Sequence, residues 1–117
     1  MADIKKGILD LIQGSNPMWE GKVFISAAPD KVDAPYIVIT DSSSDPINTT
    51  SGSLTSGTLD INIFTPDIEA AEEYYAALRD LLDKADVGSL RCYYSSDKID
   101  FYPDYELYDR VLTIKYI

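Results

Sequence analysis

The sequence predicts an α+β fold, with one mainly antiparallel sheet of about five strands, two helices packed on one face and a long hairpin loop. Three observations lead to this prediction. Two segments repeat apolar residues with the period of an amphipathic helix, several others alternate like strands, and a polar segment at residues 41–57 separates two of these strands. The chain of 117 residues, 45% of them hydrophobic, is long enough for one domain that spans residues 1–117.

Residues 57–88 give the clearest pattern, that of a strand leading directly into a helix. Apolar and polar residues alternate along 59–63, as in a strand with one buried face. Thr65, Pro66 and Asp67 predict the helix start, because they supply a hydroxyl for backbone N–H groups, a proline at the first helical position and an acid in the first turn. The predicted buried face of this helix consists of Ile68, Ala71, Tyr74, Tyr75, Leu78, Leu81, Leu82 and Ala85.

Shorter patterns predict the remaining elements. A helix is expected over residues 3–13, with Asp3 as its N-cap and Gly14 as its end. Strands are expected over residues 22–26, 35–40, 90–94, 99–102 and 107–117, of which the second is apolar enough to be buried on both faces. In the last strand, Leu112, Ile114 and Tyr116 are expected on one face, with Arg110, Thr113 and Lys115 nearer the other.

The segment at residues 41–57 is rich in Ser, Thr and Asp and poor in large apolar residues. Such side chains hydrogen-bond to their own backbone and favour turns over regular structure. The segment is longer than most connections between paired strands. Two interpretations remain open: a functional hairpin tip that projects from the body, or a surface loop without a role.

Composition excludes several classes of function. Twenty acidic and ten basic side chains give a net charge of −10, which disfavours sequence-independent binding of nucleic acid. The sequence has no histidine, the commonest general base, and Cys92 has no second cysteine for an internal disulfide. It shows neither a secretory signal nor an apolar run of membrane-spanning length. We therefore expect a protein made in the cytoplasm that is not an enzyme and uses no metal or other cofactor. Among its partners we expect no membrane and no specific nucleic-acid sequence.

Two clusters near the C-terminus each allow a functional and a plain structural interpretation. The acids Asp97, Asp100, Asp104, Glu106 and Asp109 do not have the spacing of a calcium loop, so we interpret them as a solvated acidic edge. Six of the nine tyrosines lie at or after residue 93. Tyrosine is enriched at protein interfaces but is also common, half-buried, at sheet margins. The candidate interface residues are Tyr102, Tyr105 and Tyr108.

The order of these segments resembles that of a known family. A short N-terminal helix is followed by a strand at residues 22–25, by Ala27-Ala28-Pro29, by Ala34-Pro35-Tyr36 opening an apolar strand, by the polar hairpin, and by the strand at residues 57–64. The amphipathic helix with Ala70, Ala71, Leu78, Leu81 and Leu82 completes the series. Over residues 4–86 the chain resembles the tail-completion or tail-terminator proteins of long-tailed bacteriophages and prophages.

The resemblance implies a structural role in the virion tail. Such proteins form a ring, usually a hexamer, on the completed tail tube and present the surface that joins the head. The implied partners are copies of the chain itself, the tail-tube protein and head–tail connector proteins. It transfers no catalytic residue.

Two expectations follow for assembly. The polar hairpin tip becomes an assembly element, with candidate residues Ser43, Ser44, Asp45, Asn48, Thr49, Thr50, Ser51 and Leu54. Part of the negative charge is expected to line a channel for DNA, where like charge prevents adhesion. The alternatives are a head-closure or connector protein docked to the portal, and a cytosolic protein-binding module unrelated to phages.

Overall fold

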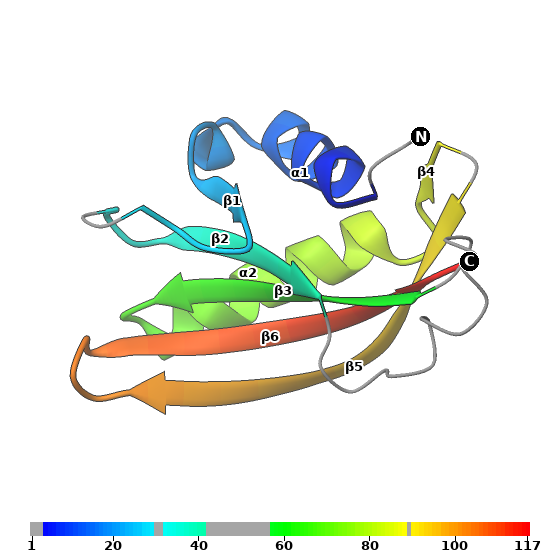
Figure 1. Cartoon of the computed structure of the whole chain (residues 1–117). Coiled ribbons are helices and arrows are strands. Elements are labelled where there is room, and N and C mark those ends of the chain that lie inside the picture. The colour runs from blue at the N-terminus through cyan, green and yellow to red at the C-terminus, as the bar shows by residue number, and fades with distance from the viewer. Residues whose placement is uncertain (1–3, 30–31, 42–56, 89) are drawn as a thin grey trace.

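The computed structural model describes residues 4–29, 32–41, 57–88 and 90–117. Six strands form one sheet in the order β1-β2-β3-β6-β5-β4, with β1 parallel to β2 and every other neighbouring pair antiparallel (Figure 1). The predicted α+β class is therefore confirmed. In chain order the elements are α1 (Ile4–Ser15), the 3-10 helix η1 (Pro17–Trp19), β1 (Val23–Ile25), β2 (Tyr36–Asp41), β3 (Gly57–Thr65), α2 (Ile68–Leu82), β4 (Asp86–Val87), β5 (Leu90–Tyr102) and β6 (Leu107–Tyr116).

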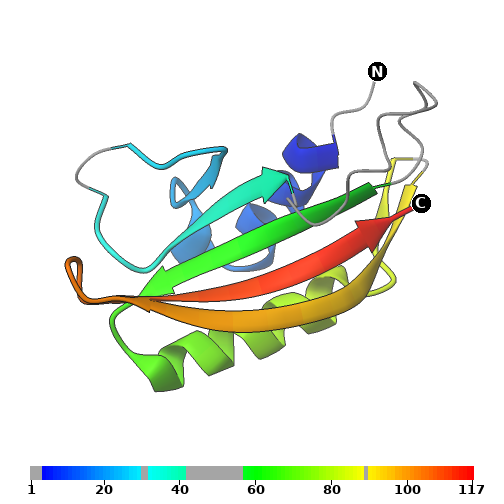
Figure 2. The same cartoon turned by 60° about the horizontal axis from the view of Figure 1, so that its bottom comes forward.

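Both helices cover the same face of the sheet, as predicted. In Figure 1 strands β3 and β6 pass in front of α2, and Figure 2 shows α2 running along the sheet. Alternate residues of the strands point toward the helices and form the apolar core, while the opposite face carries no helix among the described residues. The fully buried core side chains include Ile8, Ile12, Ile37, Ile39, Leu59, Ile61, Ile63, Leu82, Cys92, Leu112 and Ile114.

Strands β2 and β3 pair antiparallel, which confirms the predicted hairpin. Tyr36 lies opposite Phe64 at one end of the pair, and Asp41 lies opposite Leu59 at the other. Burial alternates at every position of β3, and the three central residues of β2 are all buried. Both patterns match the sequence prediction. The tip of the hairpin, residues 42–56, lies outside the described residues.

Helix α2 begins later than predicted. The N-cap is Asp67, whose carboxylate accepts a hydrogen bond from the backbone N–H of Glu69 at 3.0 Å. Thr65 ends strand β3 instead, and its hydroxyl accepts from the N–H of Asp67 at 3.4 Å. Asp67 directly precedes the helix, so its carboxylate can reach the N–H of the second helical residue and is the better cap. Thr65 instead closes the turn between β3 and the helix. Ile68, at the first helical position, is exposed rather than buried.

Helix α1 runs through Gly14 to Ser15, so the predicted end at Gly14 was wrong. The helix contains a second glycine at its centre, Gly7, which lies against Val87 of β4. A Cβ atom at Gly7 would collide with Cγ1 of Val87, whereas a Cβ at Gly14 would meet nothing within 4 Å. Glycine at position 7 thus permits the close approach of β4 to the helix.

Gly7→Ala is expected to lower the free energy of unfolding by about 1–2 kcal/mol, because the stiff valine must move to accept the new methyl group. Gly14→Ala is the matched control in the same helix, and alanine's helix propensity is expected to raise stability there by up to about 1 kcal/mol. Urea unfolding of both variants checks this. Equal stabilisation by the two alanines would contradict the close approach.

Strand β5 is continuous where two separate strands had been predicted. It runs from Leu90 to Tyr102 and pairs with β6 along its length, with a register shift between Tyr94 and Ser96. A β-bulge accommodates the polar residues 95–98, which lie between the two predicted strands, inside a single strand. The long β5–β6 hairpin therefore ends in the turn after Tyr102 (Figure 1).

The predicted face of Arg110 was also wrong. β6 keeps an unbroken register with β3 from Tyr108 to Tyr116, so Arg110 shares the helix-covered face with Leu112 and Ile114. Its charge suggested the solvent face, but partners on α2 and β5 make burial possible, as described below.

Candidate functional site

A groove of about 780 Å³ lies on the face of the sheet opposite the helices. Its floor comes from β2, β3, β5 and β6, and the segment after β1 forms one wall. The strand register places the floor residues on one face, because Tyr36 lies opposite Phe64, Phe64 opposite Asp109, and Tyr102 opposite Leu107. We call this the aromatic groove; its lining residues are Ser26, Ala27, Ala28, Pro29, Val32, Asp33, Ala34, Tyr36, Val38, Thr40, Asn62, Phe64, Tyr102, Tyr105, Leu107 and Asp109.

A row of rings supplied by β2, β3 and β5 runs along the groove. The rings of Tyr36 and Phe64 stack with centroids 5.0 Å apart, and those of Phe64 and Tyr102 stack at 6.3 Å. Tyr105, in the β5–β6 turn, also lines the groove and is 76% exposed. Aromatic faces are broad, rigid surfaces that lose little conformational entropy on binding. The end of the hairpin thus presents a preformed apolar surface.

One charged group is buried in this surface. Asp109 is 4% exposed and lines the groove. Its Oδ2 accepts a long hydrogen bond of 3.4 Å from the hydroxyl of Tyr102, and its Oδ1 has no hydrogen-bond partner among the described residues. A buried carboxylate oxygen without a donor destabilises a protein, so its presence calls for an explanation.

The environment of Asp109 disfavours its charge. Burial and, to a lesser extent, the neighbouring carboxylate of Asp100 raise the pKa of Asp109 from 3.8 to about 6. Lys98 and the hydroxyl of Tyr102 act in the opposite direction without compensating. The pKa of Tyr36 is raised mainly by burial and secondarily by the charge of the same Asp109 carboxylate. The groove therefore contains a carboxyl group that is poorly stabilised in the isolated chain.

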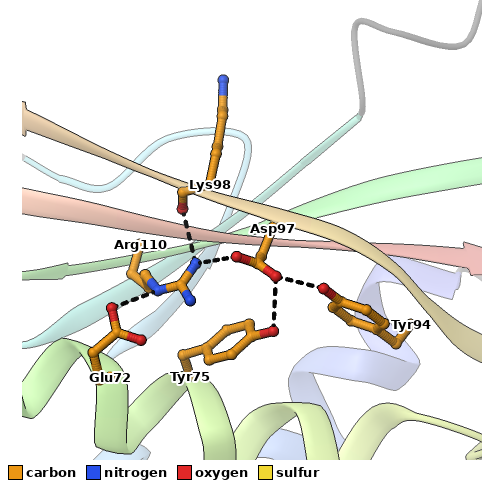
Figure 3. A network of polar contacts seen from close by, with 6 residues as sticks. All are labelled: Glu72, Tyr75, Tyr94, Asp97, Lys98 and Arg110. Atoms are coloured by element: carbon orange, nitrogen blue, oxygen red, sulfur yellow. Dashed lines mark hydrogen bonds and ion pairs between the residues drawn. The ribbon is translucent and has the colours of Figure 1, made fainter.

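On the other face of the hairpin, a polar network holds β5 and β6 to α2 (Figure 3). The guanidinium of Arg110 donates to Asp97 at 2.8 Å, to Glu72 at 3.0 Å and to the backbone carbonyl of Lys98 at 3.2 Å. It also lies 3.9 Å from the centroid of the Tyr75 ring, a cation–π contact. Arg110 thus links Asp97 and Lys98 on β5 to Glu72 and Tyr75 on α2.

Asp97 completes this network. One carboxylate oxygen accepts from the hydroxyls of Tyr75, at 2.9 Å, and of Tyr94. The hydrogen bonds from Tyr94, Arg110 and Tyr75 hold the pKa of Asp97 down at about 2. Because Asp109 precedes Arg110 in β6, the network on one face fixes the backbone that positions the groove carboxyl on the other.

The structure separates the three predicted interface tyrosines. Tyr102 and Tyr105 line the aromatic groove, whereas Tyr108 lies opposite Thr65 and packs on Phe101, with centroids 4.8 Å apart, on the helix-covered side. The candidate assembly residues at 43–54 lie outside the described residues, so that hypothesis stays a prediction.

The interpretation of the five acids as a solvated edge was wrong for Asp109, whereas the other four stay exposed. Asp109 is buried, and Asp97 is held by Arg110 and two tyrosines on the opposite face. The described residues include no group of three or more acidic, histidine or cysteine side chains placed to hold a metal ion. Nor do those residues form a helix long and apolar enough to cross a membrane. Cys92 is fully buried, and desolvation raises the pKa of its thiol to about 11.

The sequence analysis did not predict that Asp109 and Arg110 are both buried, on opposite faces of the sheet. A signal was available: in β6 the alternation of apolar residues from Leu112 and Ile114 continues onto Arg110, so the strand period alone assigns it to the core side. It likewise assigns Asp109 to the face of Val111. The burial of that face at one end could not be foreseen, because the groove wall comes from a distant segment.

Comparisons with known proteins agree with the resemblance noted in the sequence. The family "Tail completion protein gp17" matches residues 12–117. The chain belongs to this family. The match includes the Tyr-rich segment after residue 90, which the sequence comparison had left out. Membership identifies the chain as a structural protein of a virion tail. A search of curated protein sequences gave no match.

A solved structure supports the fold. A chain in the "Virion of native gene transfer agent (GTA) particle" superposes with a TM-score of 0.70 and 13% sequence identity, covering 97% of this chain and 92% of that one. At this identity the likeness is one of fold alone.

Proposed function

We propose that this member of the tail completion family caps the tail tube as a ring of identical subunits and forms part of the surface to which the head is joined. The match to the family over residues 12–117 carries the proposal. A fold shared with a chain of a phage-like particle supports it. In this proposal the narrower statements, namely the ring, the tube and the joining surface, come from what the resemblance in the sequence implies, and the family name itself says only tail completion.

The end of the β5–β6 hairpin is the proposed contact with neighbouring subunits or tail proteins. Ile99, Phe101, Tyr102 and Tyr105 are 41%, 48%, 41% and 76% exposed there, and they lie on both faces of the hairpin. A cluster of large apolar side chains at one projecting end is unusual for an isolated protein and typical of an interaction surface.

The first test is the mass of the purified protein across concentration, with and without its tail-tube protein. A ring, either alone or only on the tube, is the expected result. High net negative charge opposes self-association in free solution, so we expect the tube to promote the ring. A chain that stays monomeric with the tube protein and instead binds the portal side would assign it to head closure.

Tyr105→Ala is expected to weaken this assembly roughly tenfold, as loss of an exposed aromatic anchor does at many interfaces. Tyr93→Ala is the matched control, since Tyr93 is an exposed tyrosine of the same hairpin at its opposite end. Sedimentation of both variants with the tube protein measures the effect. Equal weakening by both, or by neither, would remove the hairpin end from the interface.

The assembly role predicted for residues 43–54 is an independent part of the proposal. Deletion of residues 43–55 is expected to leave the core folded and to impair ring or tail assembly. Far-ultraviolet circular dichroism reports the first property and sedimentation with the tube protein the second. Unchanged assembly by the deletion variant would leave this segment as a plain surface loop.

A further inference from the structure

The aromatic groove contains an acceptor without a donor. Among the described residues, two buried side-chain oxygens lack a hydrogen-bond partner, Oγ1 of Thr58 and Oδ1 of Asp109. A hydroxyl can act as donor or acceptor, whereas an ionised carboxylate can only accept hydrogen bonds. Burial without a donor therefore costs more free energy for the carboxylate. Of the two, only Asp109 lines the groove. Its Oδ1 is therefore a hydrogen-bond acceptor in the groove that a donor from outside the chain could satisfy.

The surroundings of this oxygen select the kind of donor. The rings of Tyr36, Phe64 and Tyr102 line the same groove, and the π-systems of aromatic rings attract cations. Asp33 lines it as well, so a second carboxylate contributes negative charge to the same space. An anion or another carboxylate would be repelled here. A planar or compact cation carried on an apolar stem would satisfy the rings and the carboxylate together.

We propose that the aromatic groove binds the side chain of an arginine or lysine supplied by a different protein, with Asp109 accepting its hydrogen bonds. Charge favours a different protein over a second copy. The chain carries a net charge of −10, and four of its basic side chains, Lys5, Lys6, Arg91 and Arg110, already lie within 3.1 Å of carboxylates on the same chain. The raised pKa of Asp109 agrees with a carboxylate that a bound positive charge would stabilise.

This inference rests on the proposed function only for the setting in which the basic side chain is met, namely a neighbouring protein of the tail. Recognition by the groove itself can be measured with small probes that involve no assembly. The probes are N-acetyl-arginine amide and its neutral analogue N-acetyl-citrulline amide, which has almost the same shape and lacks the charge. Titrations are followed by amide chemical shifts of the isotope-labelled protein.

The arginine probe is expected to shift amides around Asp109, Asn62 and Tyr36, and to bind at least about tenfold more tightly than the citrulline probe. Asp109→Asn is expected to remove that preference. Asp104→Asn, which removes the same charge from the exposed hairpin turn, is the control and is expected to keep it. Bound arginine is also expected to lower the pKa of Asp109, read from its carboxyl carbon shift, with Asp100, Asp60, Lys98, Tyr102 and Tyr36 as the groups that face it.

Equal binding of the two probes would overturn the inference, as would unchanged binding by Asp109→Asn or shifts confined to another surface. Measurement of self-association for wild type and Asp109→Asn distinguishes a basic side chain of a different protein from one of a second copy. Unchanged self-association with loss of the arginine preference supports a different protein as partner. A tenfold loss of self-association in Asp109→Asn would identify a second copy as the occupant and overturn the assignment to a different protein. Absence of any ring would count against the proposed function and leave the probe result intact.

Discussion

Replacement of Arg110 by methionine is expected to lower the free energy of unfolding by about 3 kcal/mol at pH 7. Methionine keeps much of the volume of the 8% exposed arginine but removes its charge. Asp97 and Glu72 then lose their partner, and the ring of Tyr75 loses the cation above it. Glu72 is half exposed and can be solvated, so most of the loss is expected from Asp97 and the packing around it.

Lys6→Met is the matched control for this prediction. The pair between Lys6 and Asp10 has nearly the same length, 2.9 Å, but both side chains are more than 60% exposed. An exposed pair at positions i and i+4 of a helix contributes about 0.5 kcal/mol or less, because solvent screens it. Urea unfolding of both variants provides the comparison. A cost for Arg110→Met no greater than for Lys6→Met would mean that the network does not hold the hairpin to α2.

The pH dependence of the Arg110 effect follows from Asp97. The folded pKa of Asp97, about 2, is lower than its ordinary 3.8, so the folded state binds fewer protons than the unfolded state in this range. The stabilisation is therefore complete above about pH 4 and is lost as the pH falls toward 2. The difference in stability between wild type and Arg110→Met is expected to stay constant from pH 7 to 4 and then to shrink.

Asp109→Asn is expected to stabilise the isolated protein by up to about 3 kcal/mol at pH 7.5. Ionisation of a carboxyl group whose folded pKa is about 6 instead of 3.8 costs roughly this amount, at 1.4 kcal/mol per pH unit. Asparagine avoids the cost, although its amide must also find partners in the groove. A residue that destabilises the free chain and lines a groove is one whose benefit lies in binding.

The sign of the pH dependence distinguishes this account from a change in packing. The folded pKa is raised, so the folded state binds more protons than the unfolded state between pH 3.8 and 6, and wild-type stability falls as the pH rises through that range. The advantage of Asp109→Asn is thus expected to vanish below about pH 4 and to be complete above pH 6. Lys98, Asp100 and Tyr102 on β5, Asp60 on β3 and Tyr36 on β2 are the groups that face this carboxyl.

Thermal unfolding of Asp109→Asn across pH 3.5–8 measures this dependence. Asp104→Asn, in the exposed turn, is the control and is expected to stay within about 0.5 kcal/mol of wild type at each pH. The same gain for Asp109→Asn at pH 3.5 and pH 8 would refute the ionisation cost and point to packing instead.

Much of the fold could be predicted because its elements are locally encoded. The alternation along β3 and the apolar stripe of α2 each express one buried face, and the polar segment after β2 separates two strands that do pair. The hairpin and the side on which the helices lie follow from these patterns. One error arose at the start of α2, where the nearby carboxylate of Asp67 caps the helix in place of Thr65. Another arose in the polar stretch of β5, where pairing with β6 overrides the local signal.

The candidate site was predictable only in part. Of the three tyrosines singled out near the C-terminus, two line the groove, and their role at an interface stays a prediction. Their separation from Tyr108 follows from the strand register, which depends on pairing with β3. The assembly segment at residues 43–54 stays a prediction.

The sequence by itself determined the class of fold, the strand-to-helix unit at residues 57–82 and, through the order of its segments, the family. It did so because periodicity and segment order are properties of the chain alone. Only the tertiary structure decided which of two adjacent charged residues of β6 meets a partner. Arg110 reaches Asp97 and Glu72 on one face, and Asp109 meets aromatic rings on the other. The free energy of a buried charge depends on neighbours that are distant in the sequence, and folding alone brings those neighbours together.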